Sequence, residues 1–514
     1  MVLVISIQLL FMLFLAALGL CILSSLILIL PITSRNYIKV HLWLLALPPI
    51  IAVVGLFSTE RPVITEYWQL DPLAWLLASF VLFIGLILQR FSFNYLKGDR
   101  NYKKYFVLFT FMTVIASLAW MSNDMRVFIV CWGLTLFCLT RLLQLNQRWH
   151  VTKEAGKVTT SLFFIAWFAL LIAMILLHIS TDTWQITSVL AYVDSQNMNV
   201  WLLQLILLLI VLGVLIPAAQ WPFQRWLIES VLAPTPVSAI MHAGIVNAGG
   251  IILTRFSTLF NGGDIATVLL LLFATMSVLI GSGINLVHVD YKRQMVGSTI
   301  SQMGFMLVQC GLGAYSAAII HLILHGIFKA TLFLKSGSAL RHFEASSQMN
   351  KRTTYSWIIA GRALAVDIAI IYWFTTSLGN YQLISAIILG WSLSVAWTQL
   401  VALGQGAIAR VAGLCALIIV GAVYLFVHHV FEGWLSGGVT GDTQPPLLVV
   451  ICIIGALMLG SIVTTRLAQH PSSKAFAILY LWLIHLGEPH MKTVEAHPHY
   501  LKYQLLRGEK KDES

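Results

Sequence analysis

Residues 317–338 read AAIIHLILHGIFKATLFLKSGS, an apolar run that carries two histidines and a lysine in its middle. His321, His325 and Lys329 recur every fourth residue, which places them along one face of an α-helix. An ionisable residue inside a membrane span is energetically costly and by default marks an ion pathway or a functional pair. Histidine titrates near neutrality and a desolvated lysine loses its proton readily, so the three can pass protons through intervening water. The alternative, in which each side chain only hydrogen-bonds a neighbouring helix, is less favoured for three such residues on one face.

The composition of the whole chain gives the environment of this helix. Of 514 residues, 59% are hydrophobic and 10% are charged, with a mean hydropathy of +0.87, whereas soluble domains carry about 25% charged residues. A soluble, disordered or disulfide-stapled chain is therefore excluded. No segment shows the alternating pattern of a transmembrane β-barrel. The formal net charge of +11 is better explained by basic loops that face anionic lipid than by nucleic acid.

Apolar blocks recur along the chain at the length that a bilayer-spanning helix needs, about 20 residues. We therefore predict an all-α polytopic membrane protein with about fifteen transmembrane helices, in the lipid bilayer of a cell (inner) membrane. The blocks cover residues 5–30, 40–57, 70–90, 105–121, 126–145, 160–179, 199–219, 236–258, 265–286, 298–312, 315–340, 355–376, 382–403, 411–430 and 446–465.

The distribution of lysine and arginine predicts the orientation of these helices. The odd-numbered connections carry most of the basic residues, from Arg35 in the first to the tail that follows Arg466. The even-numbered connections hold only Arg61, Arg126 and Arg255. Because basic loops stay on the cytoplasmic side, the N-terminus is expected outside and the C-terminus in the cytoplasm.

A second motif, residues 217–250, combines prolines with polar residues inside an apolar region. Its four prolines cannot all lie in one regular helix, because each removes a backbone donor and clashes with the preceding turn; they are Pro217, Pro222, Pro234 and Pro236. Irregular backbone at membrane depth needs protein or water around it, so we predict a broken helix beside a cavity. Arg225 and Glu229 are spaced for a salt bridge, and a structural role for this pair is favoured over a role in ion transport. His242 follows, with Asn247 as its polar partner on the same helix.

A third motif, NLVHVDYKRQMVGSTISQMGFM, covers residues 285–306. Asp290 and Lys292 belong to a short charged hinge between two spans, and Ser301 and Gln302 give the next helix a polar stripe. A charged loop that merely anchors two helices explains the hinge equally well. The cysteines show no CxxC motif and the histidines no ligand spacing, so we expect no metal site, no cofactor and no catalytic residue in this chain.

These motifs together resemble the antiporter-like, proton-pumping subunits of respiratory complex I and Mrp-type antiporters. The resemblance covers about residues 65–340 and is closest to the L-type (subunit 5) branch, to which LDPLAWLL and NYLKGDRNYKKYF are also similar. It implies an antiporter-like core with broken helices. It also implies that five residues lie where that family keeps its proton-channel histidines and lysines: His242, Lys292, His321, His325 and Lys329.

The chain departs from this family at two positions. The family has a membrane glutamate in a W-E-G motif where this chain reads Cys131-Trp132-Gly133, and a lysine in the broken helix where this chain has Pro217. We also find no later lysine motif resembling F-F-S-K after residue 340, and no long lateral helix.

A shorter chain with this core is similar to the membrane subunit of Dab (Mps-type) inorganic-carbon accumulation systems. That resemblance implies a large peripheral cytoplasmic partner of the DabA type, which resembles β-carbonic anhydrase and holds the zinc. It implies coupling of a proton or cation gradient to the conversion of CO2 into bicarbonate. We divide the chain into N-terminal helices (1–64), the antiporter-like core (65–340), divergent C-terminal helices (341–466), and an interfacial helix with a cytoplasmic tail (467–514).

The sequence is also compatible with two other functions. One is a subunit of an NADH–quinone oxidoreductase or a cation/proton antiporter. The other is a membrane anchor that conducts nothing, which the losses at Trp132 and Pro217 suggest.

Overall fold

The computed structural model describes residues 6–59, 61–145, 150–195, 198–260, 265–336, 355–375, 380–397, 407–435, 446–469 and 472–489. The tail with its histidines (His490, His497 and His499) lies outside these residues.

The N-terminal part of the chain forms long helices with a two-stranded hairpin between the third and the fourth. These elements are α1 (Ile7–Ile29), α2 (Tyr37–Leu44), α3 (Leu47–Ser58), β1 (Val63–Ile64), β2 (Gln69–Leu70), α4 (Pro72–Tyr95), α5 (Tyr102–Met121), α6 (Met125–Leu143), α7 (His150–Thr181), α8 (Ile186–Ser195) and α9 (Val200–Leu215). The antiparallel strands pair Val63 with Leu70 and Ile64 with Gln69.

Shorter, interrupted helices follow, and long helices then resume. The interrupted region contains α10 (Arg225–Glu229), η1 (Ser230–Leu232), α11 (Thr235–Ala243), η2 (Ile245–Asn247), α12 (Ala248–Arg255) and η3 (Ser257–Leu259). The later helices are α13 (Ile265–Val287), α14 (Tyr291–Gly311), α15 (Tyr315–Leu334), α16 (Tyr355–Thr375), α17 (Asn380–Ala396), α18 (Ala407–Leu435), α19 (Leu447–Gln469) and α20 (Lys474–Gly487).

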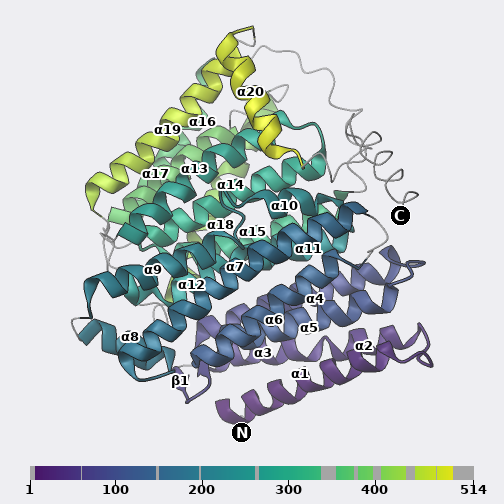
Figure 1. Ribbon diagram of the computed structural model, residues 1–514. Coiled ribbons are helices and arrows are strands. Elements are labelled where there is room, and N and C mark those ends of the chain that lie inside the picture. The colour runs from purple at the N-terminus through teal and green to yellow at the C-terminus, as the bar shows by residue number, and fades with distance from the viewer. Residues whose placement is uncertain are drawn as a thin grey trace, which may run out of the picture.

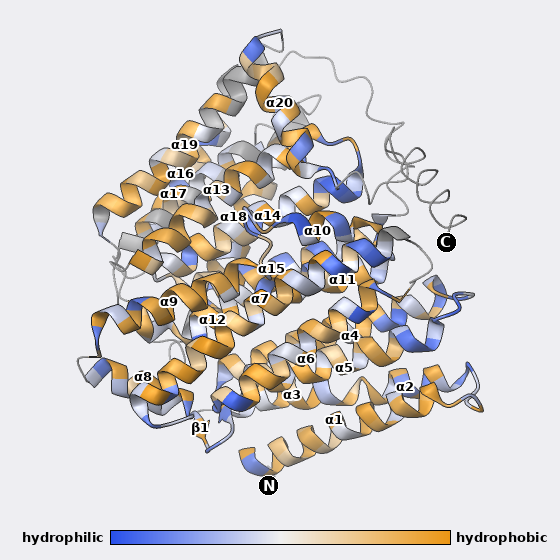
Figure 2. Cartoon of the chain, in the orientation of Figure 1, coloured by the Kyte–Doolittle hydropathy of each residue, from blue (hydrophilic) through white to orange (hydrophobic). Residues whose placement is uncertain are grey.

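The long helices run roughly alongside one another, with the hairpin and α8 at one end of the layer and α10 and α20 towards the other (Figure 1). Apolar residues extend along the helices, whereas hydrophilic ones gather at α10 and at many helix ends (Figure 2). Within the described residues, ten helical stretches are long and apolar enough to cross a membrane. Shorter apolar helices accompany them. The predicted fold class, an all-α polytopic membrane protein with broken helices, is confirmed.

Two predicted single spans are each split into two helices. The block 40–57 consists of α2 and α3, because Pro48 and Pro49 fall in the first turn of α3 and supply no backbone donors to a preceding turn. The block 236–258 is interrupted at Gly244, where α11 ends, η2 intervenes and α12 begins. The prolines of residues 217–236 predicted a broken helix, whereas neither of these two interruptions was predicted.

Glycines allow α13 and α14 to approach closely. A Cβ atom added to Gly281 would lie 2.5 Å from the backbone nitrogen of Ser301, and one added to Gly297 would lie 2.6 Å from that of Asn285. Small residues at a helix contact let backbones meet in a membrane, where no hydrophobic force drives helices together. The helices α13 and α14 therefore pack tightly against each other, and α14 also contacts α15.

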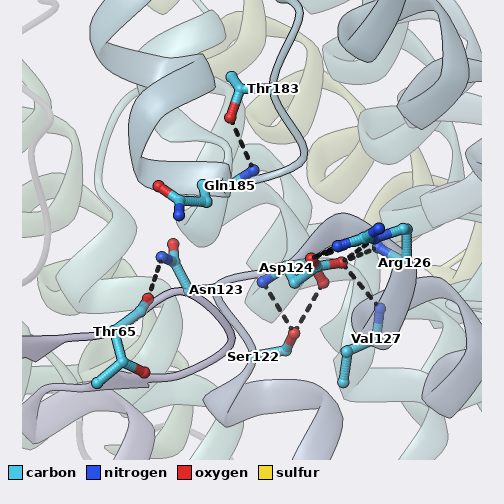
Figure 3. Close-up of polar contacts among 8 residues, drawn as sticks. All are labelled: Thr65, Ser122, Asn123, Asp124, Arg126, Val127, Thr183 and Gln185. Carbon is cyan, nitrogen blue, oxygen red and sulfur yellow. Dashed lines mark hydrogen bonds and ion pairs between the residues drawn. The ribbon is translucent and has the colours of Figure 1, made fainter.

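A hydrogen-bonded cap at the hairpin end joins three separate segments (Figure 3). The Asn123 side-chain amide donates to the carbonyl of Thr65 at 2.8 Å, and its carbonyl oxygen accepts from the Thr187 amide at 3.1 Å. Asp124 caps α6 by accepting from the amides of Arg126 and Val127, and it also pairs with the Arg126 guanidinium at 2.7 Å. The cap holds the start of α6 against the hairpin and α8.

Candidate functional site

Helix α15 carries the polar line that the sequence predicted. His325 and Lys329 are buried, at 6% and 1% exposure, and the rings of His321 and His325 lie 5.9 Å apart. The three residues thus share one face of a helix whose other residues are mostly apolar. A row of titratable groups at this spacing can relay protons if water joins them.

Lys329 is joined to His242 through two groups on α14. Its ammonium donates to the carbonyl of Met295 at 3.0 Å, and the Thr299 hydroxyl donates to the same oxygen at 2.9 Å. The Thr299 oxygen in turn lies 3.0 Å from Nδ1 of His242. Because the hydroxyl proton is used on Met295, Nδ1 must be the donor, which leaves Nε2 of neutral His242 as a proton acceptor. The structure therefore connects α11, α14 and α15 by one polar chain.

The two histidines of the α15 line differ in their partners. Nδ1 of His321 lies 3.2 Å from the carbonyl oxygen of Gln309, an atom that only accepts, so Nδ1 donates. Nε2 of His325 is buried and has no hydrogen-bond partner among the described residues. A buried unpaired nitrogen is costly, so His325 is the point of the line where a further polar group is required.

Two breaks position His242 at this line. Pro234 is the N-cap of α11 and Pro236 lies in its first turn, so the helix starts at Thr235. It ends one residue after His242, whose ring stacks on Phe333 of α15 with centroids 4.5 Å apart. His242 therefore sits at the inner end of a short helix rather than within a long one.

The other prolines lie in the irregular segment between α9 and α10. Pro217 and Pro222 lie in turns. Nearby backbone groups that lack a helical hydrogen bond are bound by side chains instead. The Trp226 indole donates to the Ile216 carbonyl at 2.7 Å, and the Gln220 amide donates to that of Ala218 at 2.7 Å. The Trp221 amide donates to Ser277 of α13 at 2.9 Å. The predicted broken helix is confirmed, and its backbone is held by protein.

A cavity of about 520 Å³ lies next to this segment. Lys292 and Glu229 line it, together with Tyr95, Lys97 and Asp99. The Lys292 ammonium donates a hydrogen bond to the Ala233 carbonyl at 3.3 Å. Met295, the acceptor of Lys329, follows Lys292 by one turn of α14, so this cavity adjoins the polar chain.

The predicted salt bridge between Arg225 and Glu229 is present at 2.8 Å. Arg225 is half exposed, whereas Glu229 is fully buried and its second carboxylate oxygen has no hydrogen-bond partner among the described residues. One carboxylate oxygen thus fixes α10, and the other remains available beside the cavity.

Other predicted site residues serve the framework. Asp290 caps α14 by accepting from the amides of Lys292 and Arg293. Ser301 hydrogen-bonds Ser282 at 2.8 Å across the α13–α14 contact, and Gln302 is exposed, apart from the polar chain. Asn247 donates to the carbonyl of Ala243 at 2.7 Å and so bridges the break at Gly244 rather than contacting His242.

Sequence reasoning missed three participants and one ion pair. Met295 contributes a backbone carbonyl, which has no sequence signal, while Thr299 and Gln309 are polar positions on a helix already known to carry a polar stripe. Asp71 caps α4 and also binds Arg255 in a buried salt bridge at 2.5 Å. Two of the three arginines in even-numbered connections, Arg126 and Arg255, are thus paired with carboxylates.

Comparison with known families identifies the family of the chain. Residues 122–411 match the family described as NADH:quinone oxidoreductase/Mrp antiporter, transmembrane, and residues 64–106 match the complex I chain 5 N-terminus. The chain therefore belongs to the NADH:quinone oxidoreductase/Mrp antiporter family of membrane subunits.

Within that family, the chain is similar to inorganic carbon transporter subunits. It is 53% identical to the probable inorganic carbon transporter subunit DabB of Bacillus subtilis, over 94% of this chain and 95% of that protein. It is 52% identical to the protein of the same name from Bacillus anthracis, over 92% of each chain. The predicted resemblance to the Dab membrane subunit is confirmed.

Solved structures show the same fold at low sequence identity. A structure of the Mrp complex from Dietzia sp. DQ12-45-1b aligns with a TM-score of 0.59 and 23% identity, covering 96% of this chain and 57% of that chain. The archaeal membrane-bound sulfane sulfur reductase aligns with a TM-score of 0.59 and 20% identity, over 94% and 98%.

Proposed function

We propose that this chain is the membrane subunit of an inorganic-carbon transport complex and couples a proton or cation gradient to carbon accumulation. The observation that carries the proposal is the 53% identity, over nearly the full length of both chains, to a protein named as such a subunit. The buried polar chain on α11, α14 and α15 supplies the part of the chain that would respond to the gradient.

The proposed pathway follows the polar groups along α15. From one side, protons reach His321 and pass by water to His325. They then reach Lys329 and His242, which share the Met295–Thr299 connection. The cavity lined by Lys292 and Glu229 provides the opening on the other side. With the N-terminus outside and the C-terminus cytoplasmic in the inner membrane, as the basic loops predict, this cavity faces the cytoplasm.

The chemistry of carbon conversion belongs to a partner in this proposal. The partner is a large cytoplasmic zinc subunit of the DabA type, resembling β-carbonic anhydrase, and the zinc is bound by that subunit. Helix α20 lies at the same end of the molecule as α10 and exposes Ile478, Leu481 and Trp482, which suits contact with lipid or with a partner (Figure 1).

The experiment compares Lys329→Ala with Lys39→Ala, a matched change at an exposed lysine on α2. Each variant is co-expressed with the partner subunit in a host that lacks carbonic anhydrase and needs high CO2 to grow. We expect Lys329→Ala to abolish growth in air while the complex still co-purifies, and Lys39→Ala to retain growth. Undiminished growth of the Lys329→Ala strain would overturn the proposed role of this lysine.

Two further measurements separate the alternatives. The family match favours a cation/proton antiporter subunit as the second candidate, and it predicts Na⁺/H⁺ exchange in vesicles or co-purification with redox subunits. A non-conducting anchor predicts carbon uptake that an uncoupler does not affect. Inhibition of uptake by an uncoupler, without redox subunits in the purified complex, supports the coupled transporter.

A further inference from the structure

A small cavity lies beside α15, and its lining residues differ from those of the cavity that contains Lys292. Its volume is about 30 Å³, enough for one or two water molecules. It is lined by residues of α4, α5, α6, α11, η2, α12 and α15, and the polar ones include Trp132, Asn247, Thr113 and Thr135. Apolar side chains form most of the remaining wall.

Two of the lining residues have polar atoms without partners. Trp132 is fully buried, and its indole N–H has no hydrogen-bond acceptor among the described residues. Asn247 is 1% exposed; its amide nitrogen binds the Ala243 carbonyl, but its carbonyl oxygen lacks a donor within the described part of the chain. One unpaired donor and one unpaired acceptor therefore belong to residues that line the same small space, and a water molecule can satisfy both.

The α15 line comes close to this cavity at the turn that contains His325. Leu322, three residues before His325, is part of the cavity wall. A Cβ atom added to Gly326 would lie 3.0 Å from the Ala243 carbonyl, the same oxygen that Asn247 binds. His325 does not itself line the cavity but follows Leu322 by less than one turn of α15, and its Nε2 has no hydrogen-bond partner in the described structure.

We propose that this cavity is a water-binding site, in which Trp132 and Asn247 hold ordered water that extends the proton line from His325 towards α6. This inference rests on the proposed function for its role, but the water site itself does not. Trp132 donates to the water oxygen, and the water donates one proton to Asn247. Its other proton, or a second water, reaches the free nitrogen of His325. Trp132, which stands where the family has a glutamate, then acts as a positioning residue for the water.

Radiolytic labelling tests the site directly. Brief X-ray irradiation of the purified full-length protein converts bound water into hydroxyl radicals, which oxidise adjacent side chains, and mass spectrometry measures the oxidation. Trp226 is the internal control, because it is equally buried but its indole already donates to Ile216. We expect Trp132 to be labelled faster than Trp226. Equal, background-level labelling of the two would overturn the water site.

Two substitutions test the role of the water. Ala116→Leu fills the cavity from α5, and Ala119→Leu makes the same change at a buried position on that helix outside the cavity wall. In folded protein, we expect Ala116→Leu to remove the Trp132 labelling and Ala119→Leu to keep it. Trp132→Phe, which removes only the donor, should lower gradient-driven uptake by about tenfold, the effect of losing one hydrogen bond. Unchanged uptake in both Ala116→Leu and Trp132→Phe would overturn the role in the relay. Labelling of Trp132 without any carbon uptake by the parent would leave the site standing and refute the proposed function instead.

Discussion

Asp71 and Arg255 are 184 residues apart in the chain and form a buried, two-bonded ion pair, with N–O distances of 2.5 and 3.0 Å. The pair ties the start of α4 to the end of α12. Arg255 also donates to the Trp120 carbonyl at 3.1 Å, so α5 is joined to the same point. The end of the broken helix that follows His242 is thereby fixed to the N-terminal helices.

Breaking this pair should destabilise the protein strongly. Asp71→Asn leaves a buried guanidinium without its counter-charge, and loss of one partner of a buried ion pair costs about 3–5 kcal/mol. Denaturant unfolding in detergent measures this loss. Asp124→Asn is the comparison, since its partner Arg126 is half exposed, and we expect a much smaller effect there. Equal stability losses for the two variants would contradict the assignment.

The close approach of α13 and α14 predicts a second difference in stability. Gly281→Ala places a methyl group against the backbone of Ser301 and Gly297, which cannot rotate away, and should cost about 1–3 kcal/mol. Gly455→Ala on α19 is the control, because a Cβ atom there meets no atom within 4 Å. Alanine favours a helix over glycine, so the control should be neutral or slightly stabilising. Thermal unfolding of the two variants checks this prediction.

The Thr299 hydroxyl should matter for transport more than for folding. Thr299→Val keeps the shape of the side chain but removes the group that joins His242 to the Met295 carbonyl. We expect uptake to fall about tenfold, with Thr299→Ser restoring it. Uptake in vesicles, normalised to folded protein, is the measurement. Equal activity of the valine and serine variants would show that this connection is not used.

The cap at the hairpin end should loosen in acid. Burial of Asp124 raises its pKa, but hydrogen bonds from Arg126 and Val127, together with the arginine charge, outweigh this and hold the pKa below its ordinary value of 3.8. A carboxylate with a lowered folded-state pKa stabilises the fold above pH 3.8, and this contribution disappears as pH falls through the lower folded value. Hydrogen exchange at Val127, corrected for its intrinsic pH dependence, should therefore rise at the acid end. Asp124→Asn should show no such step; a step of the same size in that variant would assign it to another group.

The approximate positions of the membrane helices were predictable from the sequence, because each apolar block must be long enough to cross the bilayer. The spacing of His321, His325 and Lys329 alone predicted that they share one face, since the direction of a side chain around a helix follows from its residue number. The prolines likewise announced the interruption between α9 and α11. The break at Gly244 had no comparable signal, because glycine is common within membrane helices.

The sequence by itself determined the all-α membrane fold, the polar line on α15 and the membership of the family, because hydropathy, periodicity and motif order are properties of the chain. Only the tertiary structure decided what these groups touch. It showed that Lys329 meets His242 through the Met295 carbonyl and Thr299, and that Asp71 neutralises Arg255. It also placed Trp132 and Asn247 around one cavity. The physical reason is that a hydrogen bond between distant helices depends on packing, and a backbone carbonyl that serves as an acceptor carries no residue type for a sequence to reveal.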